Sequence, residues 1–103
     1  MIRAEFYKSE GLLNRFNITG HAGYADHGSD VVCAAVSSAV QLIVNILEEF
    51  DCEPSVTVED DLIDCRITAS AQTGSALLEQ LVLHLRSVCE EFPKTIKITI
   101  SEV

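Results

Sequence analysis

The chain of 103 residues is 48% hydrophobic, a length and composition that predict one domain with a single apolar core. Sixteen acidic residues against seven basic ones give a formal net charge of -9, which argues against direct binding of nucleic acid and suits a basic partner. The stretch MIRAEFYKSEG has no apolar signal segment, and we expect no later apolar run to reach the roughly 18 residues of a membrane span, so we predict a soluble cytoplasmic protein without a membrane anchor.

The first half of the chain predicts a strand hairpin followed by a helix. Apolar and polar residues alternate over residues 2–7 and 12–19, the pattern of two half-buried strands, which are joined here by the turn SEG. From residue 30 to about residue 50, apolar residues recur at intervals of three and four, which predicts an amphipathic helix. One face of the second strand is expected to hold Asn14, Phe16 and Ile18.

The second half repeats this order and adds a last strand. Residues 55–59 and 62–69 predict a second hairpin around two aspartates, residues 74–92 predict a second helix, and residues 95–103 predict a closing strand. The order is ββαββαβ, and each strand has one apolar face. We therefore expect a two-layer α+β fold, in which a mostly antiparallel sheet carries both helices on one face, with residues 1–103 as a single domain.

The first predicted helix carries more apolar surface than one sheet face can cover. Its second apolar stripe consists of Val31, Ala35 and Leu42. Exposed apolar surface of this kind marks an interaction site, most simply with a second copy of the chain, so we predict a homodimer.

Three of the four cysteines have positions that indicate a structural role or none. All four are widely spaced without a CxxC pair, which predicts neither a zinc knuckle nor a thioredoxin-type motif. Cys65 lies in an alternating strand pattern and Cys89 on the apolar stripe of the second helix, so both are expected in the core. Cys52 follows the end of the first helix and is expected to be inert.

Cys33 is the cysteine whose position suggests a chemical role. If Ser29 or Asp30 caps the helix, Cys33 occupies its third or fourth position, where unpaired backbone N–H groups and the helix dipole stabilise an anion. A thiolate is the attacking form of cysteine, so this position favours a nucleophile. The alternative is that Cys33 simply packs inward.

His21 is the candidate base for Cys33. It directly follows the second strand, and a strand end and a helix start joined by one loop can bring a histidine beside a thiol. His27 is the rival base, but it lies in a loop tip that would hold it loosely. His84 lies on the polar face of the second helix and is expected to be solvated.

The segment between this strand and helix is a candidate substrate-binding loop. Its glycines provide hinges and its tyrosine an aromatic contact, and a loop of this kind can close over an extended peptide and exclude water. The alternative is a flexible surface loop without such a role. The loop residues are Ala22, Gly23, Tyr24, Asp26, His27 and Gly28.

A zinc site is a further alternative at this turn, with His21, His27, Cys33 and an aspartate as ligands. The spacing of these residues matches no standard zinc-ligand pattern. A thiolate beside a histidine already has a use as a nucleophile, so we expect no bound metal.

The stretch GHAGYADHGSDVVCAAVSSAV, in a ββαββαβ chain of this length, resembles the ribosomal-processing cysteine protease family called Prp. The resemblance covers essentially the whole chain, and its most specific parts are GHA at residues 20–22 and DVVCAAVS at residues 30–37. It implies a homodimeric cytoplasmic cysteine endopeptidase without a metal or organic cofactor. In that family the substrate is the N-terminal extension of the large-subunit ribosomal protein L-twenty-seven of some bacteria.

Carried onto this chain, the resemblance implies His21 as the catalytic histidine and Cys33 as the nucleophile. The family also has an acidic residue at the position of Asp30 and a serine at that of Ser37, and this chain has both. We expect Asp30 to cap the helix. Ser37 lies four residues after Cys33 on the same helix face, where it can support the thiol or line its pocket.

These residues predict a thioester mechanism, in which His21 takes the proton of Cys33 and the thiolate attacks the scissile carbonyl. Backbone N–H groups at the helix start, including that of Cys33, are expected to stabilise the oxyanion. The sequence assigns no third residue to orient His21, so we expect a dyad rather than a triad.

Two other classes of function remain open. A non-catalytic module that binds a ribosomal protein would account for the charge and the apolar surplus, but it would not need His21 and Cys33 together. A thiol redox protein would use Cys33, but the next cysteine, Cys52, lies beyond the far end of the helix.

Overall fold

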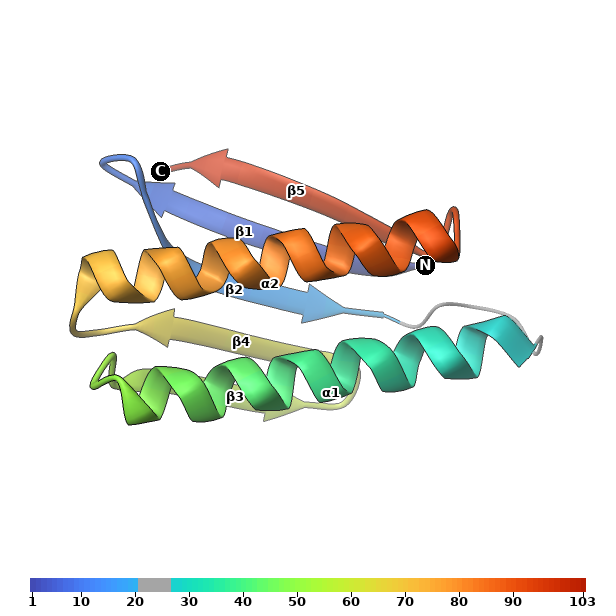
Figure 1. Ribbon diagram of the computed structural model, residues 1–103, viewed down its shortest axis with the longest axis horizontal. Helices are drawn as coiled ribbons and strands as arrows, with labels where there is room; N and C mark the ends of the chain where they lie inside the picture. The colour runs from blue at the N-terminus through green and yellow to red at the C-terminus, as the bar shows by residue number, and fades with distance from the viewer. Residues whose placement is uncertain (21–26) are drawn as a thin grey trace.

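The computed structural model describes residues 1–20 and 27–103, including all of their side chains except those of residues 27–30. The described chain forms five strands and two helices in the predicted order (Figure 1). They are β1 (Ile2–Ser9), β2 (Leu12–Thr19), α1 (His27–Glu49), β3 (Pro54–Glu59), β4 (Leu62–Ile67), α2 (Ala71–Glu91) and β5 (Ile96–Glu102).

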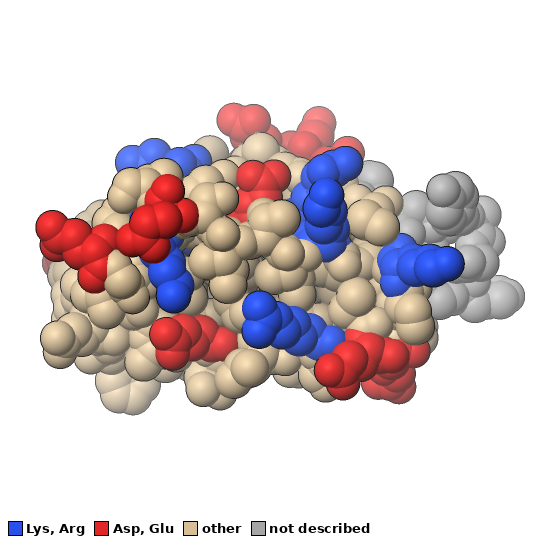
Figure 2. Space-filling model, turned by 90° about the horizontal axis from the view of Figure 1, so that it is seen from above, with Lys and Arg blue, Asp and Glu red and all other residues tan. Residues whose placement is uncertain are grey.

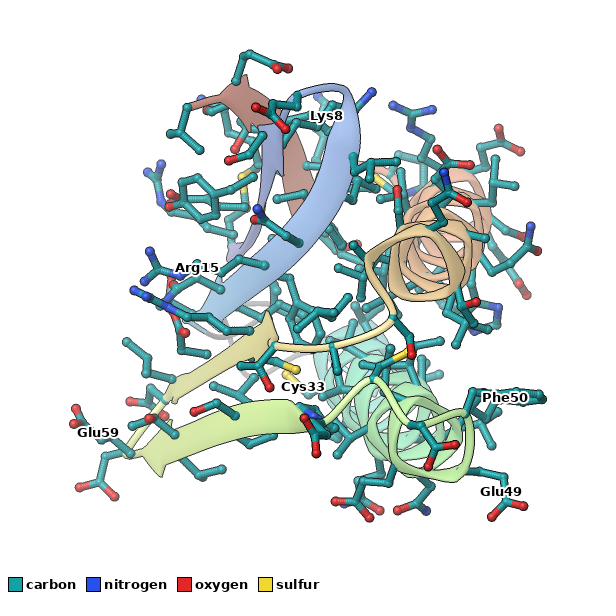
Figure 3. The ribbon with its side chains drawn as sticks, turned by 90° about the vertical axis from the view of Figure 1, so that its left-hand side faces the viewer. Lys8, Arg15, Cys33, Glu49, Phe50 and Glu59 are labelled. Atoms are coloured by element: carbon teal, nitrogen blue, oxygen red, sulfur yellow. The ribbon has the colours of Figure 1, made fainter. Side chains whose placement is uncertain are left out.

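The strands form one sheet in the order β3-β4-β2-β1-β5. The β1–β2, β2–β4 and β3–β4 pairs are antiparallel, and β5 pairs parallel with β1 after the chain crosses over through α2. Both helices cover the same face of the sheet, α2 over β1 and β2 and α1 over β3 and β4 (Figures 1 and 3). The predicted two-layer α+β fold is confirmed.

The core lies between the helices and the sheet, because the strands turn alternate side chains toward the helices. Phe6 of β1 and Phe16 of β2 are fully buried at its centre, with ring centroids 6.0 Å apart. The core face of α1 is formed at intervals of three and four residues by Val32, Val36, Val40, Ile43 and Leu47.

A β-bulge in β2 corrects the predicted alternation of that strand. Tyr7 pairs with Arg15 and the next residue, Lys8, pairs with Leu13, so Asn14 is the extra residue. An inserted residue reverses the phase of the alternation. Leu13 is therefore buried in the core, whereas Asn14 was expected there.

The sheet face away from the helices is polar and held by charged side chains. The Arg15 guanidinium donates to one Asp64 carboxylate oxygen from Nη2 at 2.7 Å and from Nε at 3.0 Å, and Asn17 Nδ2 donates to the same oxygen at 2.9 Å. Partial burial alone would raise the pKa of Asp64, but these hydrogen bonds and the Arg15 charge outweigh burial and lower it. Asp64 thus ties β4 to β2 as a carboxylate.

The apolar composition of α1 contradicts the expectation that no run reaches the length of a membrane span. Over Val31–Glu49 the helix has a mean hydropathy of 1.9 and is long and apolar enough to cross a membrane, by length and composition only. The core helix of a two-layer fold passes the same test, and one face of α1 packs on the sheet. Only 28% of that stretch is buried within the chain, so much of its apolar surface is left uncovered.

A substitution of Ser75 in α2 tests whether its hydroxyl stabilises the bulge in β2. The Leu13 N–H, next to the bulge residue Asn14, donates to the Ser75 hydroxyl at 2.9 Å in the core. Ser75→Ala leaves a buried N–H without an acceptor, so we expect it to lower the free energy of unfolding by about 1–3 kcal/mol in urea titrations. The control is Ser87→Ala, at an exposed position of the same helix, which should change it by less than about 0.5 kcal/mol. Equal losses in the two variants would show that the hydroxyl does not hold the bulge.

Candidate active site

Cys33 lines a pocket of about 400 Å³ between α1 and the sheet. In Figure 3 its side chain lies between α1 and the β3–β4 pair. The wall on the helix is formed by Cys33, Val36, Ser37, Val40 and Gln41. The wall on the sheet is formed by Ile2, Ile18, Gly20, Val58, Asp61, Leu62 and Ile63.

The lining of this pocket is mostly aliphatic, with a few polar groups at defined points. The lining residues with polar side chains are Cys33, Ser37, Gln41 and Asp61. An apolar pocket with a few convergent polar groups is the usual form of a ligand site. Here it is suited to an apolar side chain whose backbone lies against Cys33.

The structure brings together two of the four predicted catalytic and supporting residues. Cys33 and Ser37 line the pocket one helical turn apart. His21 lies outside the described residues, and so do the loop residues Ala22, Gly23, Tyr24 and Asp26. His27, Gly28 and Asp30 are described as backbone only.

Helix α1 begins at His27, three residues before the predicted start. His27 and Gly28 therefore belong to the helix and not to the predicted loop. Asp30 lies within the first turn, so it is not the cap that we expected. The physical reason is that the stretch HGS lacks a proline and can continue the helix backward, although Gly28 is a poor helix former.

The earlier helix start also corrects the argument for activating Cys33. Cys33 is the sixth residue after His27, nearly two turns into the helix, and the effect of the dipole falls off within the first turn. Its own N–H falls where the helix uses each N–H for a bond to the residue four earlier. The Cys33 N–H is therefore not among the free N–H groups of the first turn, and its expected contribution to an oxyanion site stays a prediction.

Gly20 fixes the chain directly before His21. Its φ is +86°, and a Cβ there would lie 2.8 Å from the carbonyl oxygen of Met1, so only glycine fits without a shift of backbone. Its N–H donates to the Asp61 carbonyl at 3.0 Å. Gly20 itself lines the Cys33 pocket, and it is the last described residue before His21.

Several pocket residues could not be found from the sequence. Ile2, Val58, Asp61 and Leu62 come from β1 and from the β3–β4 hairpin, and they have no local motif. Only the pairing of β2 with β4 brings this hairpin beside Gly20. The one available signal was the position of Asp61 in a tight turn, and that signal is common to many turns.

Cys52 and Cys65 are buried whereas Cys33 and Cys89 are partly exposed, and none of the four thiols is in a disulfide. Burial raises the pKa of Cys65 to about 11, with a smaller effect from the Asp64 charge, and the predicted core position of Cys65 is confirmed. Burial also raises the pKa of Cys52, and the Asp51 charge adds to this. Cys89 is partly buried and donates to the Ile96 carbonyl at 3.3 Å.

The described residues do not test the zinc alternative. Among residues 1–20 and 27–103, excluding the side chains that are not described, no group of three or more His, Cys, Asp and Glu could hold a metal ion. Two of the candidate ligands are not among these side chains, since His21 lies outside the described residues and His27 is described as backbone only.

Comparison with known proteins gives a consistent set of relatives. The family described as Cysteine protease Prp matches residues 1–97. The ribosomal processing cysteine protease Prp of Bacillus subtilis is 29% identical over 111 residues, which cover 96% of each chain.

Solved structures share the fold over the whole chain. SMU.848 from Streptococcus mutans has a TM-score of 0.87 at 31% identity, covering 100% of this chain and 96% of its own. The essential ribosomal processing protease Prp from S. aureus, in complex with a substrate peptide, has a TM-score of 0.85 at 21% identity, covering 97% and 99%. The same S. aureus protease with a covalently linked product peptide has a TM-score of 0.85 at 22% identity, with the same coverage.

The pocket position of Cys33 leads to a test of thiol reactivity. At pH 7.5 a thiol with a pKa of about 11 is less than about 0.1% thiolate, so Cys65 should react slowly with iodoacetamide, and buried Cys52 likewise. We expect Cys33 to be alkylated first, as followed by peptide mapping over time. Cys89, also partly exposed, is the internal control. If Cys89 is labelled as fast as Cys33, exposure alone explains the reactivity and Cys33 is not an activated nucleophile.

Proposed function

Because the chain belongs to the Prp family of cysteine proteases, we propose that it removes the N-terminal extension of the bacterial large-subunit ribosomal protein L-twenty-seven during ribosome maturation. The B. subtilis relative, a ribosomal processing cysteine protease, supports this class of substrate. We assign residues 1–103 to one protease domain and place the enzyme in the cytoplasm, where ribosomes mature.

The observation that carries the proposal is that Cys33 and Gly20 line one pocket. Cys33 is held there by α1, whose neighbouring residues Val32 and Val36 are buried in the core. Gly20, on the opposite wall, directly precedes His21 in the sequence. We therefore assign Cys33 as the nucleophile and His21 as its base.

The chemistry of this pair is acyl transfer to sulfur. His21 accepts the Cys33 proton, and the sulfur attacks the scissile carbonyl carbon to form a tetrahedral intermediate. Its collapse breaks the C–N bond, the leaving amine takes the proton from His21, and a thioester remains on Cys33. Water then attacks the thioester, giving its proton to His21, and the carboxylic acid product leaves as the thiol is restored. No step needs a metal or an organic cofactor.

The remaining assignments concern binding. We assign Ser37 to the pocket wall beside Cys33, and residues 22–26 to the segment that covers the bound peptide. The aliphatic walls favour an apolar side chain next to the scissile bond, because its burial removes apolar surface from water. A basic ribosomal protein is drawn to a chain of net charge -9 most strongly at low salt. Figure 2 shows acidic and basic side chains interspersed on the surface above β5. On that face no single acidic patch is present to attract a basic protein.

We further propose that two copies associate through α1. The predicted stripe is uncovered in this chain: Val31 is 52% and Leu42 is 61% exposed, and Ala35 is partly exposed. A second copy of α1 would cover this surface symmetrically. Leu83 of α2, a further apolar candidate, is also exposed.

Light scattering at micromolar concentration tests the homodimer. We expect twice the chain mass of 11.3 kDa for the wild type, because burial of the α1 stripe removes exposed apolar surface from water. Leu42→Glu places a charge in the stripe and should give the monomer mass with an unchanged circular dichroism spectrum. Val103→Glu, a change of the same kind at an exposed residue outside α1, is the matched control and should stay dimeric. A wild-type mass near 11.3 kDa would exclude this association.

A digest of the extended ribosomal protein, read by mass spectrometry, tests the catalytic pair. We expect Cys33→Ala to abolish cleavage and His21→Ala to reduce it by roughly 10²–10⁴-fold, because general-base catalysis contributes that much. His27→Ala is the matched control and should retain most activity, since α1 holds residue 27 about nine ångströms along its axis from Cys33, at 1.5 Å per residue. Equal losses for the two histidines would mean that the base is wrongly assigned. Binding without cleavage by the wild type would favour the non-catalytic module.

A further inference from the structure

We propose that the outer edge of β3 binds the substrate peptide as an added strand, with main-chain hydrogen bonds to Val56 and Val58. The peptide then passes across the pocket in front of Cys33. This inference rests on the proposed protease function and adds the mode of substrate binding to it.

The first observation is that β3 is an edge strand with apolar side chains in solvent. In the described part of the chain, β3 has a strand partner only on the side of β4. Val58 is 71% and Val56 is 38% exposed. Proteins usually protect such an edge with charge or proline, because it can pair with another chain.

The protection of this edge is confined to its ends. Pro54 begins β3 and Glu59 ends it, but the residues between them, Ser55–Val58, carry neither charge nor proline. The usable stretch is therefore four residues long, enough for two pairs of hydrogen bonds to one extended peptide.

The register of the hairpin shows which groups face outward. Glu59 pairs with Leu62 across a two-residue turn, so they exchange both hydrogen bonds of the closing pair. Hydrogen-bonded and non-hydrogen-bonded pairs alternate in an antiparallel ladder. Val58 opposite Ile63 and Val56 opposite Cys65 are therefore non-hydrogen-bonded pairs, and their N–H and C=O groups point away from β4 to the open edge.

The side chains of the same two valines face the helix layer. Their ladder partners Ile63 and Cys65 belong to the core side of β4, and residues opposite each other share a face. Val58 lines the Cys33 pocket itself. Val58 therefore borders the Cys33 pocket and also presents outward main-chain groups at the open edge.

On the other side of the Cys33 pocket from Val58 lies a row of side chains along α1. Cys33, Ser37 and Gln41 follow each other at intervals of four residues, and all three line the pocket. The row spans about 12 Å at 1.5 Å per residue, the length of about four residues of an extended peptide. Figure 1 shows α1 lying over the β3–β4 pair with its axis roughly along the strands, and Val58 of β3 lines the same pocket as this row.

The docking mode is β-augmentation, in which main-chain hydrogen bonds provide affinity and side-chain pockets provide specificity. The pocket takes the alternate side chains that point toward the helices. A second copy of this chain, paired edge to edge through β3, is the competing occupant, and it predicts a different outcome in the experiment.

Val58→Pro tests the proposed main-chain hydrogen bond most directly, because it removes an N–H that does not bond to β4. Edge strands tolerate proline, so the fold should be kept. We expect it to lower kcat/KM on a peptide that spans the extension and the first mature residues by tenfold or more. Val58→Thr keeps the N–H and the branched shape and should stay within about threefold of wild type. The rate of Cys33 alkylation by iodoacetamide, measured in both variants, reports whether either substitution alters the pocket that Val58 lines, and the comparison of cleavage rates is corrected for it.

A second measurement covers the case in which Val58→Pro does not fold. Peptides that carry one N-methyl group at successive amides are titrated into the Cys33→Ala variant, and binding is measured by fluorescence anisotropy. We expect alternate positions to lose tenfold or more in affinity, because only every second amide faces β3. Uniform loss of affinity, or no loss, would overturn the proposal. A Val58→Pro variant that is monomeric but cleaves normally would also overturn it, because that result would assign the β3 edge to a second copy of the chain.

The same titration separates this inference from the proposed function. Alternating losses in a protein that does not cleave would confirm peptide docking at β3 and refute only the protease mechanism. Cleavage by wild type without the alternating pattern would support the protease function and refute peptide docking at β3.

Discussion

The packing of α1 on the sheet is the constraint on which the candidate site depends. Val32, Val36 and Val40 are buried in the core, and this fixes the rotation of the helix about its axis. Each residue of a helix is turned by about 100° from the one before it, so Cys33 and Ser37 fall at the margin of the buried face. The thiol is thereby held rigidly at the border between core and solvent, where it is reachable and still partly shielded from water.

The sheet completes the site by long-range pairing. The β2–β4 ladder brings the β3–β4 hairpin beside the end of β2, and the hydrogen bond from Gly20 N–H to the Asp61 carbonyl joins them at that end. Gly20 has no Cβ, which lets the end of β2 lie against the carbonyl of Met1. A strand end, a hairpin turn and a helix face meet at one place, although they are far apart in the chain.

Two features of the fold are incomplete within one chain, and each corresponds to a proposed partner. The outer surface of α1 exposes Val31 and Leu42, which fits a second copy. The edge of β3 exposes Val58 and two outward main-chain groups, which fits an extended peptide. Because α1 forms one wall of the pocket and also carries the stripe, association of two chains would stiffen the helix that holds Cys33.

The sequence by itself determined the elements, their order, the two-layer arrangement and the chemical identity of the candidate pair. Period-two and period-3.6 patterns depend on which residues face a core, and neighbours in the chain carry that information. The resemblance to the Prp family depended on a short stretch that includes His21 and Cys33, so it too was local.

Only the tertiary structure decided the start of α1 at His27, the bulge at Asn14, the sheet wall of the pocket and the place of β3 at the edge. The Leu13 N–H next to the bulge finds its acceptor in α2, the Ser75 hydroxyl, which lies 62 residues away in the chain. Val58 and Asp61 become pocket residues only because β4 pairs with β2. These outcomes depend on contacts between residues distant in the chain, whose free energies no local pattern of apolar and polar residues contains.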